Sequence, residues 1–409
     1  MKDVIVIGGG ASGLLAAIYA AKSRCKVTIL EKNKVLGKKI LITGNGKCNY
    51  WNEDQSLNHY HTYNEEILEN ILTNKNQQEI LKFFDSIGII PKIRDGYYYP
   101  YSNQATSIQT ALIKEAELQG VEIITETEVL GVKKENSNFK ISTNNGIYTS
   151  KKVILATGSK ACPKTGSDGS GYKLATSLGH SIIEPLPALV QLKANAPYLK
   201  EWHGIRSDGS VSLIENNKQI STQIGEIQLT DYGLSGICIF CLSGQISRGL
   251  SQNKKEQIKI NFLHPFNLNT KEDFINWMNK RNNQILNRTI SDLLDGILNY
   301  KLINLILKLS KIKRDTYWDN LTLSEKSLLG SNLTNFLITI TGNNSFDSSQ
   351  TCTGGIPLTE INPHTMESLK TKGLYITGEL LDIDGDCGGY NLTIAWITGH
   401  IAGVGVSND

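Results

Sequence analysis

The chain has 409 residues, 40% hydrophobic and 20% charged, so a large core is available and global disorder is excluded. Lys and Arg total 42 against 39 Asp and Glu, and this net charge of +3 excludes a chain-wide polybasic nucleic-acid binder. Seven cysteines are too few for a disulfide framework of the small secreted kind, and they indicate a reducing compartment.

The N-terminal segment is apolar but lacks the pattern of a signal peptide. Residues 4–21 carry no charge, yet three successive glycines interrupt the stretch, and Asp3 stands where a basic region is needed. No other run approaches the ~18 apolar residues of a membrane-spanning helix. We therefore expect a cytoplasmic protein that has no membrane partner.

A strand–turn–helix–strand pattern opens the chain. We predict a buried parallel strand at residues 4–7, a helix at 14–22 and a second strand at 26–30. The turn between the first strand and the helix has the spacing Gly-x-Gly-x-x-Gly, with glycines at Gly8, Gly10 and Gly13. This order of elements predicts a dinucleotide-binding unit.

Each glycine in that unit has a physical role, as does the acid that follows it. Gly8 permits the tight turn, Gly10 lets a pyrophosphate approach the backbone, and Gly13 lets the helix pack closely on the strand. The helix N-terminus offers free N–H groups to the phosphates. Glu31, eighteen residues after Gly13, is placed to bind ribose hydroxyls and to repel the extra phosphate of NADP. These features leave NAD and FAD open.

Three later segments favour FAD. A lysine-rich loop with many small residues spans 32–49, and a strand ending in Ala-Thr-Gly spans 153–158. Near the C-terminus, residues 373–379 show the same order again, a strand followed by a glycine and an acid. A glycine-rich loop then leads into a helix at 393–403. A helix N-terminus beside the isoalloxazine stabilises negative charge on the reduced ring. The chain of a simple NAD dehydrogenase does not need to return to its nucleotide-binding domain near the C-terminus.

The middle of the chain predicts an insertion. Residues 188–264 fit short antiparallel strands, and two capping boxes, Thr270 with Asp273 and Thr322 with Glu325, start helices. We expect an α/β fold with a split Rossmann-like domain at 1–188 and 351–409. An antiparallel β domain occupies 189–265 and 331–350, and a helical subdomain occupies 266–330.

The chain resembles the HI0933-like (BaiN/YhiN-like) flavoprotein family of the glutathione-reductase-type superfamily. The matching stretches span almost the whole chain, and residues 360–368 followed by the Gly-Leu-Tyr strand are especially typical of the family. The resemblance implies FAD, a split nucleotide domain and two inserted domains. It does not fix the substrate, because members are linked to reduction of conjugated C=C bonds in steroids, to amine oxidation and to uridine reduction in ribosomal RNA.

From these motifs and the resemblance we expect one set of FAD-binding residues and no metal site. The set is Gly8, Gly10, Ala11, Ser12, Gly13, Glu31, Lys32, Lys39, Thr43, Gly44, Asn45, Cys48, Asn49, Val129, Ala156, Thr157, Gly158, Gly378, Glu379, Asp384, Gly389, Asn391 and Leu392. Tyr99, in an aromatic loop, and Cys387, in the C-terminal glycine-rich loop, are the catalytic candidates for proton donation.

Other reactive residues have plainer interpretations. Cys238 and Cys241 form Cys-x-x-Cys, but they lie in an apolar stretch of the insertion, which favours a buried core over a redox pair. No second ligand pair is spaced for zinc. His364 and His400 are usable acid–base groups, although a structural histidine is commoner.

We expect an FAD-dependent oxidoreductase that reduces an activated C=C bond of a small planar molecule by hydride transfer through flavin N5. Only one dinucleotide fingerprint is present, so NADH or NADPH is expected to dock transiently as the electron donor. Two alternatives stay open at this point: an oxidase of a small amine, and a uridine reductase that docks ribosomal RNA. Residues 254–315 carry twelve Lys and Arg against six acids, a patch that would suit RNA.

Overall fold

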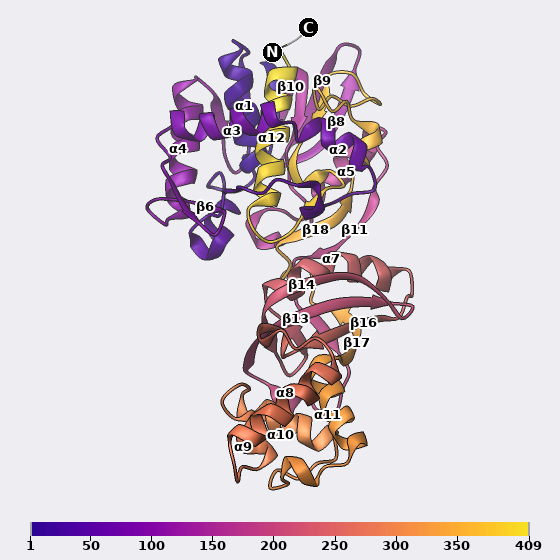
Figure 1. Ribbon diagram of the computed structural model, residues 1–409. Helices are drawn as coiled ribbons and strands as arrows, with labels where there is room; N and C mark the ends of the chain where they lie inside the picture. The colour runs from indigo at the N-terminus through magenta and orange to yellow at the C-terminus, as the bar shows by residue number, and fades with distance from the viewer. Residues whose placement is uncertain (1, 408–409) are drawn as a thin grey trace. The chain divides into compact units, whose positions relative to one another are not determined.

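The computed structural model describes residues 2–407. The chain divides into two compact units, the first formed by Met1–Leu186 with Phe346–Asp409 and the second by Pro187–Ser345. Each unit has its own cluster of buried apolar side chains. Figure 1 shows the chain entering the second unit once and returning to the first near its C-terminus. The predicted three-part division of domains stays a prediction.

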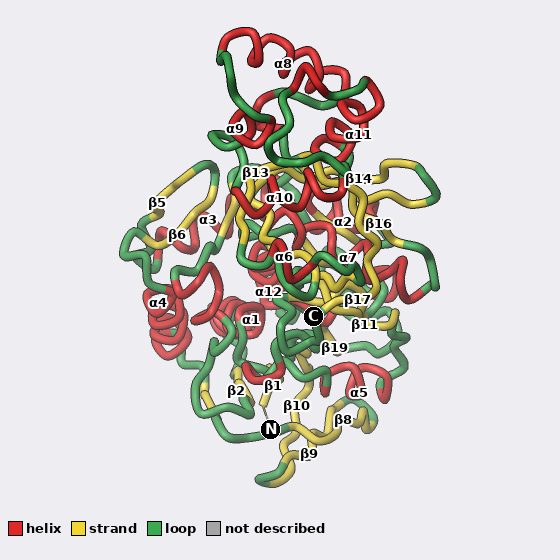
Figure 2. Tube along the Cα trace, turned by 90° about the horizontal axis from the view of Figure 1, so that it is seen from below, coloured by secondary structure: helices red, strands yellow, loops and turns green. Residues whose placement is uncertain are grey.

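A seven-stranded sheet organises the first unit. Its strand order is β7-β2-β1-β10-β9-β8, and β19 also pairs with β10. The strands β1, β2, β10, β7 and β19 pair in parallel, whereas β8 and β9 are antiparallel, and Figure 2 shows β2, β1 and β10 together. The bounds are β1 (Lys2–Ile7), β2 (Val27–Leu30), β7 (Glu122–Ile124), β8 (Val129–Glu135), β9 (Asn138–Thr143), β10 (Gly146–Leu155) and β19 (Leu374–Ile376).

Helices and small sheets surround this sheet. The central strands are continuous apolar runs because helices cover them. The remaining helices and 3₁₀ turns of the unit are α1 (Ala11–Lys22), η1 (Ile40–Gly46), η2 (Leu57–His59), α2 (Glu65–Ile71), α3 (Asn74–Ser86), α4 (Ala105–Leu118), η3 (Pro163–Thr165), α5 (Ser170–Ser177), η6 (Leu358–Glu360), η7 (Gly378–Leu380) and α12 (Tyr390–Gly405). Its small sheets are β3-β6-β5, β20-β4 and β11-β18, made from β3 (Trp51–Asn52), β4 (Tyr60–His61), β5 (Pro91–Arg94), β6 (Tyr97–Pro100), β11 (Ile183–Ala188), β18 (Thr351–Gly355) and β20 (Asp384–Gly385).

The second unit is a closed antiparallel barrel that carries helices. The barrel order is β12-β15-β14-β13-β16-β17. Its strands are β12 (Leu192–Ala194), β13 (Ile205–Glu215), β14 (Lys218–Leu229), β15 (Gly233–Ser235), β16 (Glu256–Asn261) and β17 (Phe336–Asn343). Its helices and turns are α6 (Leu199–Trp202), α7 (Ile237–Ser251), η4 (His264–Phe266), α8 (Lys271–Gln284), α9 (Ile290–Leu294), α10 (Tyr300–Leu309), η5 (Trp318–Asn320) and α11 (Leu323–Thr334).

The predicted fold class is confirmed: a split Rossmann-like domain, an antiparallel β insertion and a helical part. Both predicted capping boxes are present, at the starts of α8 and α11. The closure of the inserted strands into a barrel was not predicted. Barrel closure depends on pairing between β12 and β17, which lie far apart in the sequence.

The prediction of an aromatic loop around Tyr99 is wrong, because this segment is a strand. Residues Tyr97–Pro100 form the strand β6, which pairs with β5 on one side and β3 on the other. Asp95 and Gly96 make the hairpin turn with φ of +50° and +79°. An Asp-Gly pair between β-favouring residues is a strong hairpin signal, and tyrosine itself favours strands.

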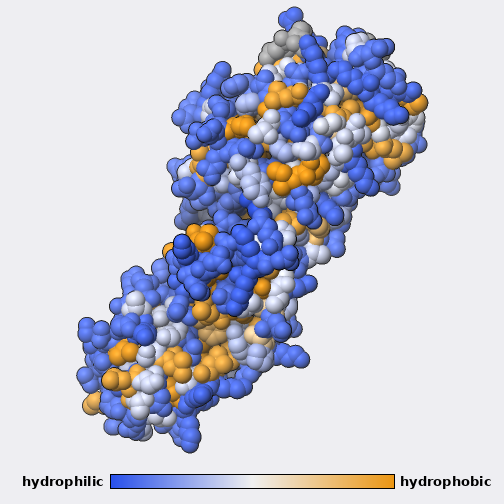
Figure 3. Space-filling view, turned by 90° about the vertical axis from the view of Figure 1, so that its right-hand side faces the viewer, coloured by the Kyte–Doolittle hydropathy of each residue, from blue (hydrophilic) through white to orange (hydrophobic). Residues whose placement is uncertain are grey.

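Among residues 2–407, no helix has both the length and the apolar character to cross a membrane. Figure 3 shows a face that is mostly hydrophilic, with separate apolar patches.

Candidate functional site

The turn between β1 and α1 is packed on one side and open on the other. A Cβ at Gly13 would overlap the carbonyl oxygen of Gly8, and a Cβ at Gly8 would lie 2.5 Å from the carbonyl oxygen of Ala156. A Cβ at Gly10, by contrast, would meet nothing within 4 Å. No side chain caps the first turn of α1, which contains Ala11. The turn therefore leaves backbone N–H groups and open space for an anion.

Glu31 lies at the end of β2 beside this turn and is 7% exposed. One carboxylate oxygen accepts from the N–H of Gly9 at 2.8 Å, and the other accepts from the backbone and side-chain nitrogens of Asn33 at 2.8 and 2.7 Å. The N–H of Thr127 bonds the carbonyl of Glu31 at 2.9 Å, which brings the segment before Val129 to this end of the sheet. A carboxylate has about four acceptor positions, so one remains for a ribose hydroxyl.

Lys32 and Asn33 hold the loop that follows β10. The Lys32 ammonium lies 2.7 Å from the Asp168 carboxylate, and the side chain of Asn33 donates to the carbonyl of Thr165 at 3.2 Å. Burial alone raises the pKa of Asp168, but the hydrogen bonds from Lys32 and Ser170 outweigh it and lower that pKa to about 2. Lys32 is thus engaged in fixing the loop.

This ion pair predicts an acid-dependent loss of stability. A carboxyl group whose pKa falls on folding stabilises the fold above its unfolded pKa and loses that effect as the pH drops to its folded pKa. The Asp168→Asn variant should therefore be less stable than wild type at neutral pH, by under about 1 kcal/mol because the pair is partly exposed. The difference should vanish near pH 2. Urea unfolding across this pH range measures it, with Glu126→Gln as the control.

Glu126→Gln removes an exposed ion pair whose two charged atoms are 3.8 Å apart. Its effect should stay small at every pH. A difference between wild type and Asp168→Asn that does not change with pH would contradict the assigned role of the carboxylate.

The segment after β10 lies against the same turn. The N–H of Ala156 donates to the carbonyl of Ile7 at 2.9 Å, which places Thr157 and Gly158 beside β1. The hydroxyl of Thr157 is buried and has no hydrogen-bond partner in the described part of the chain. This hydroxyl lies against Gly171 of α5, where a Cβ would overlap it, so it packs on that helix.

Helices α1 and α12 pack closely and run parallel. A Cβ at Gly399 would meet the carbonyl oxygen of Ser12, and a Cβ at Gly403 would lie 2.6 Å from that of Ala16. Both contacts advance by four residues in the same direction, so the helices are parallel, and Figure 1 shows them side by side. Ser12 is the second residue of α1, and Gly399, which it contacts, is the tenth residue of α12. Helix α12 therefore extends eight residues further than α1 in the N-terminal direction. Its N-terminus therefore lies about 12 Å beyond that of α1.

The α12 end of this arrangement gathers loops from distant parts of the chain. A Cβ at Gly389, the residue before α12, would lie 3.0 Å from the side-chain oxygen of Asn49, and one at Gly44 would lie 2.8 Å from the backbone nitrogen of Asn49 and 3.5 Å from the Tyr99 ring. The Asn49 oxygen is buried and unpaired among the described residues. Asn45, like Gly44, has a positive φ of 55°. The predicted loop, Tyr99 and the start of α12 thus meet around Asn49.

A second polar group lies at the start of α1. The Glu379 carboxylate is 2.6 Å from the Lys39 ammonium and accepts from the Ser159 hydroxyl at 2.9 Å. Gly378 precedes it with φ of +67°, and a Cβ there would lie 2.6 Å from the Ser12 hydroxyl. Both members of the ion pair are about four-fifths buried.

The other predicted cofactor residues support the loops of this site. The Asn391 side chain bonds both the N–H and the carbonyl of Gly385, at 2.9 and 2.8 Å, so it braces the glycine-rich loop. Thr43 donates to the carbonyl of Ile40 at 2.7 Å. Asp384 is buried on β20, and Leu392 is half-buried in the first turn of α12.

The proton-donor candidates differ in their surroundings. Tyr99 is half-buried on β6, and burial raises the pKa of its hydroxyl. Cys387 is half-buried in the loop before α12. Cys48 is fully buried, which raises the pKa of its thiol to about 12 and keeps it protonated. His400 packs on Tyr19 with ring centroids 4.3 Å apart, and burial lowers its pKa.

The Cys-x-x-Cys pair lies in the second unit. Cys238 and Cys241 are buried on α7, and burial raises the pKa of Cys238 to about 11. All seven cysteines are free thiols. A buried thiol of high pKa is a poor nucleophile, so this pair is core packing.

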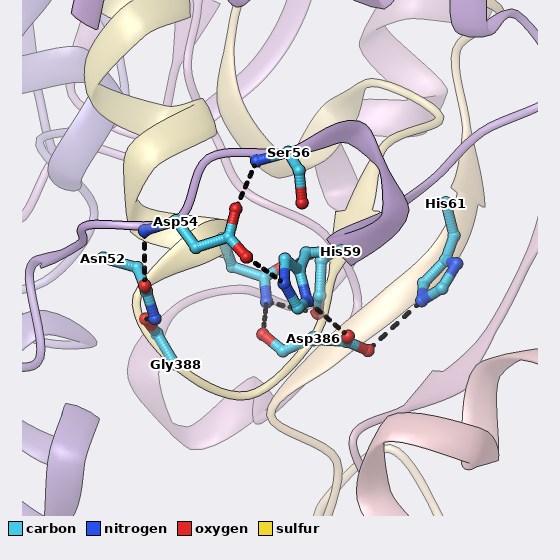
Figure 4. A network of polar contacts seen from close by, with 9 residues as sticks. Asn52, Asp54, Ser56, His59, His61, Asp386 and Gly388 are labelled. Atoms are coloured by element: carbon cyan, nitrogen blue, oxygen red, sulfur yellow. Dashed lines mark hydrogen bonds and ion pairs between the residues drawn. The ribbon is translucent and has the colours of Figure 1, made fainter. Parts of the chain in front are cut away.

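The sequence reasoning missed one cluster at the α12 end. Figure 4 shows Asp386, from the glycine-rich loop, between His59 and His61. His59 ends the turn η2 and His61 lies on β4, and only Tyr60 separates them in the sequence. That close spacing of two histidines was the available signal.

Comparison with known proteins identifies relatives. The model of the HI0933-like protein Rossmann domain matches residues 2–405. The 3-dehydro-bile acid delta(4,6)-reductase of Clostridium scindens is 40% identical, covering 98% of each chain. The ribosomal RNA dihydrouridine synthase of Escherichia coli is 27% identical, covering 96% of this chain and 95% of its own. A solved flavocytochrome c3 fumarate reductase has a TM-score of 0.47 at 16% identity, covering 99% of this chain and 78% of its own.

The match of the family model over nearly the whole chain, with the 40% identical reductase, defines the class of the protein. It is an oxidoreductase with a Rossmann-type domain. The chain belongs to the HI0933-like family.

Proposed function

We propose that the protein is an FAD-dependent oxidoreductase that reduces an activated C=C bond of a small planar molecule. The observation that carries this proposal is the pair of parallel helices α1 and α12. Neither N-terminus has a side-chain cap, and the two are staggered by about 12 Å. The stagger offers separate positive ends to the pyrophosphate and to the ring of one extended dinucleotide.

The residues along this stagger fit FAD. Open space at Gly10 suits the pyrophosphate, and Glu31 suits the adenosine ribose. The unpaired buried oxygen of Asn49 lies beside Gly389 at the start of α12, and it would gain a partner from the cofactor. We assign the predicted FAD-binding set to this site on that basis.

The FAD would supply hydride transfer through its ring, while the protein holds and tunes it. The N-terminus of α12 would stabilise negative charge on the reduced ring, since its first turn contains no acidic residue. The loop around Asn49 and the Tyr99 side chain would border the substrate. We propose NADH or NADPH as a transient donor.

The names of the relatives and the chemistry of their substrates indicate which molecule accepts the hydride. The Clostridium relative is named as a reductase of a dehydro-bile acid, and the Escherichia relative as a dihydrouridine synthase. An enone and a uracil ring both present a C=C bond conjugated to a carbonyl, so one hydride-transfer site suits either. The higher identity of the first relative favours the enone for this chain.

The test is an anaerobic acceptor panel. The purified protein would be reconstituted with FAD, reduced with NADH or NADPH, and mixed with a steroid enone, a uridine-containing ribosomal RNA fragment or air. We expect nicotinamide to bleach the flavin, the enone to restore its colour fastest, and air to restore it slowly. Restoration by RNA alone would move the assignment to uridine reduction. Failure of both nicotinamides to bleach the flavin, with rapid reoxidation by air after chemical reduction, would instead indicate an oxidase.

A further inference from the structure

A row of side chains in which acids and histidines alternate lies in the first unit, beside the start of α12. The Asp54 carboxylate is 3.1 Å from Nε2 of His59, and Nδ1 of the same ring is 3.1 Å from the Asp386 carboxylate. The other oxygen of Asp386 lies 3.3 Å from Nε2 of His61. Each contact is within hydrogen-bond reach, so the four side chains form one continuous path, as Figure 4 shows.

Exposure decreases along the first three members of this path. The side chain of Asp54 is 62% exposed, that of His59 31%, and that of Asp386 8%. His61, at the far end, is 19% exposed. The first member therefore contacts solvent, whereas Asp386, in the middle of the path, is nearly fully buried.

The path is fixed to the candidate cofactor site. The His59 ring stacks on Tyr390, the first residue of α12, with centroids 4.5 Å apart and planes 17° apart. The N–H of Asp386 donates to the carbonyl of His59 at 2.9 Å. Strands β4 and β20 pair through His61 and Asp384. These bonds hold the path at the α12 end, where the ring of FAD is proposed to lie.

The chemistry of the path suits proton movement. An imidazole can donate at one nitrogen and accept at the other, so a proton entering one side can leave from the opposite side. His59 faces a carboxylate at each nitrogen, and the buried Asp386 faces a histidine at each oxygen.

We propose that Asp54, His59, Asp386 and His61 form a proton relay, with His61 as the donor to the substrate. This inference rests on the proposed function. Reduction of a C=C bond adds a hydride to one carbon and a proton to the other. The hydride, with both electrons, comes from the reduced flavin. The N–H bond of His61 breaks as the new C–H bond forms, and one proton then passes from solvent through Asp54, His59 and Asp386 to restore it.

The first test measures whether a change at Asp386 alters both histidines, and it requires no enzymatic activity. Protein labelled with ¹⁵N in its histidine rings would be compared with the Asp386→Asn variant by NMR at neutral pH. We expect the ring signals of both His59 and His61 to shift, while those of His203 stay in place. His203 is a suitable reference because it lies in the second unit beside another carboxylate, that of Asp231 at 3.8 Å. Unchanged signals for either relay histidine would overturn the relay.

The second test separates the two half-reactions. His61→Asn should slow reoxidation of the reduced enzyme by the enone about 100-fold, the usual scale of a general acid. Reduction of the flavin by NAD(P)H should change by under about 2-fold, because that step needs no proton from His61. His203→Asn is the matched control and should affect neither step. Equal slowing of both half-reactions, or of neither, would overturn the assignment of His61.

The two tests also distinguish this inference from the proposed function. A wild-type protein that binds no FAD, or that reduces no acceptor, contradicts the proposed function. Coupled histidine signals in that protein would still support the shared path. A wild-type enzyme that reduces the enone, together with a fully active His61→Asn variant, contradicts the relay alone.

Discussion

The Gly13→Ala variant should lose FAD binding by at least about 100-fold, equivalent to about 2.7 kcal/mol. Gly13 is fixed between the turn and the sheet, where a Cβ would overlap the Gly8 carbonyl and lie 3.1 Å from the Ala156 side chain. Backbone atoms cannot yield as a flexible side chain does, so the turn and the N-terminus of α1 must move together. Titration of the apoprotein with FAD, followed by flavin fluorescence, measures the loss.

The control for this substitution is Gly342→Ala in the barrel strand β17. A Cβ at Gly342 would meet nothing within 4 Å, and its φ is in the ordinary range. It should leave both FAD affinity and stability near the wild-type values. Retention of wild-type FAD affinity by Gly13→Ala would contradict the placement of the pyrophosphate at this turn.

The second large effect is expected at His180, whose side chain is fully buried against the segment 360–368. Its Nδ1 is 2.8 Å from the Glu360 carboxylate and its Nε2 is 2.7 Å from the Ser368 hydroxyl. Burial lowers the pKa of His180 more than Glu360 raises it, so the ring is neutral at pH 7 and donates to Glu360 through Nδ1. His180→Ala should reduce the free energy of unfolding by about 2–4 kcal/mol.

The reason is that the alanine removes a packed ring and leaves two polar partners short of a bond. Ser181 still donates to Glu360, at 2.8 Å, but the Ser368 hydroxyl loses its acceptor. Urea unfolding measures the change, with His203→Ala as the control. That histidine is 59% exposed, and its removal should cost under about 0.5 kcal/mol. Equal effects of the two substitutions would contradict this account.

The N-terminal unit could be predicted from sequence because its signals are local. Strand β1, the glycine turn, α1 and β2 follow one another within thirty residues, and each boundary is set by nearby residue types. The capping boxes that start α8 and α11 are local in the same way. The hairpin at Asp95 and Gly96 has an equally local signal, the Asp-Gly pair itself.

The rest of the site depends on long-range contacts that no local pattern fixes. The pairing of Lys39 with Glu379 joins segments 340 residues apart, and Asp386 meets His59 across 327. The sequence indicated that the C-terminal loop returns to the nucleotide site, but not which side chain of the intervening segment it would face. Glu31 and Asn391 were expected to bind FAD, and the structure adds that both already brace the backbone of the site.

A crystal structure of the protein saturated with FAD is the measurement that tests the central claim most directly. We predict the pyrophosphate at the N–H groups that follow Gly10 and the isoalloxazine ring at the start of α12, beside Asn49 and within reach of the loop that carries Asp386. The unpaired oxygen of Asn49 should gain a partner. A cofactor that lies away from either helix N-terminus, or a chain that binds no FAD, would contradict the account.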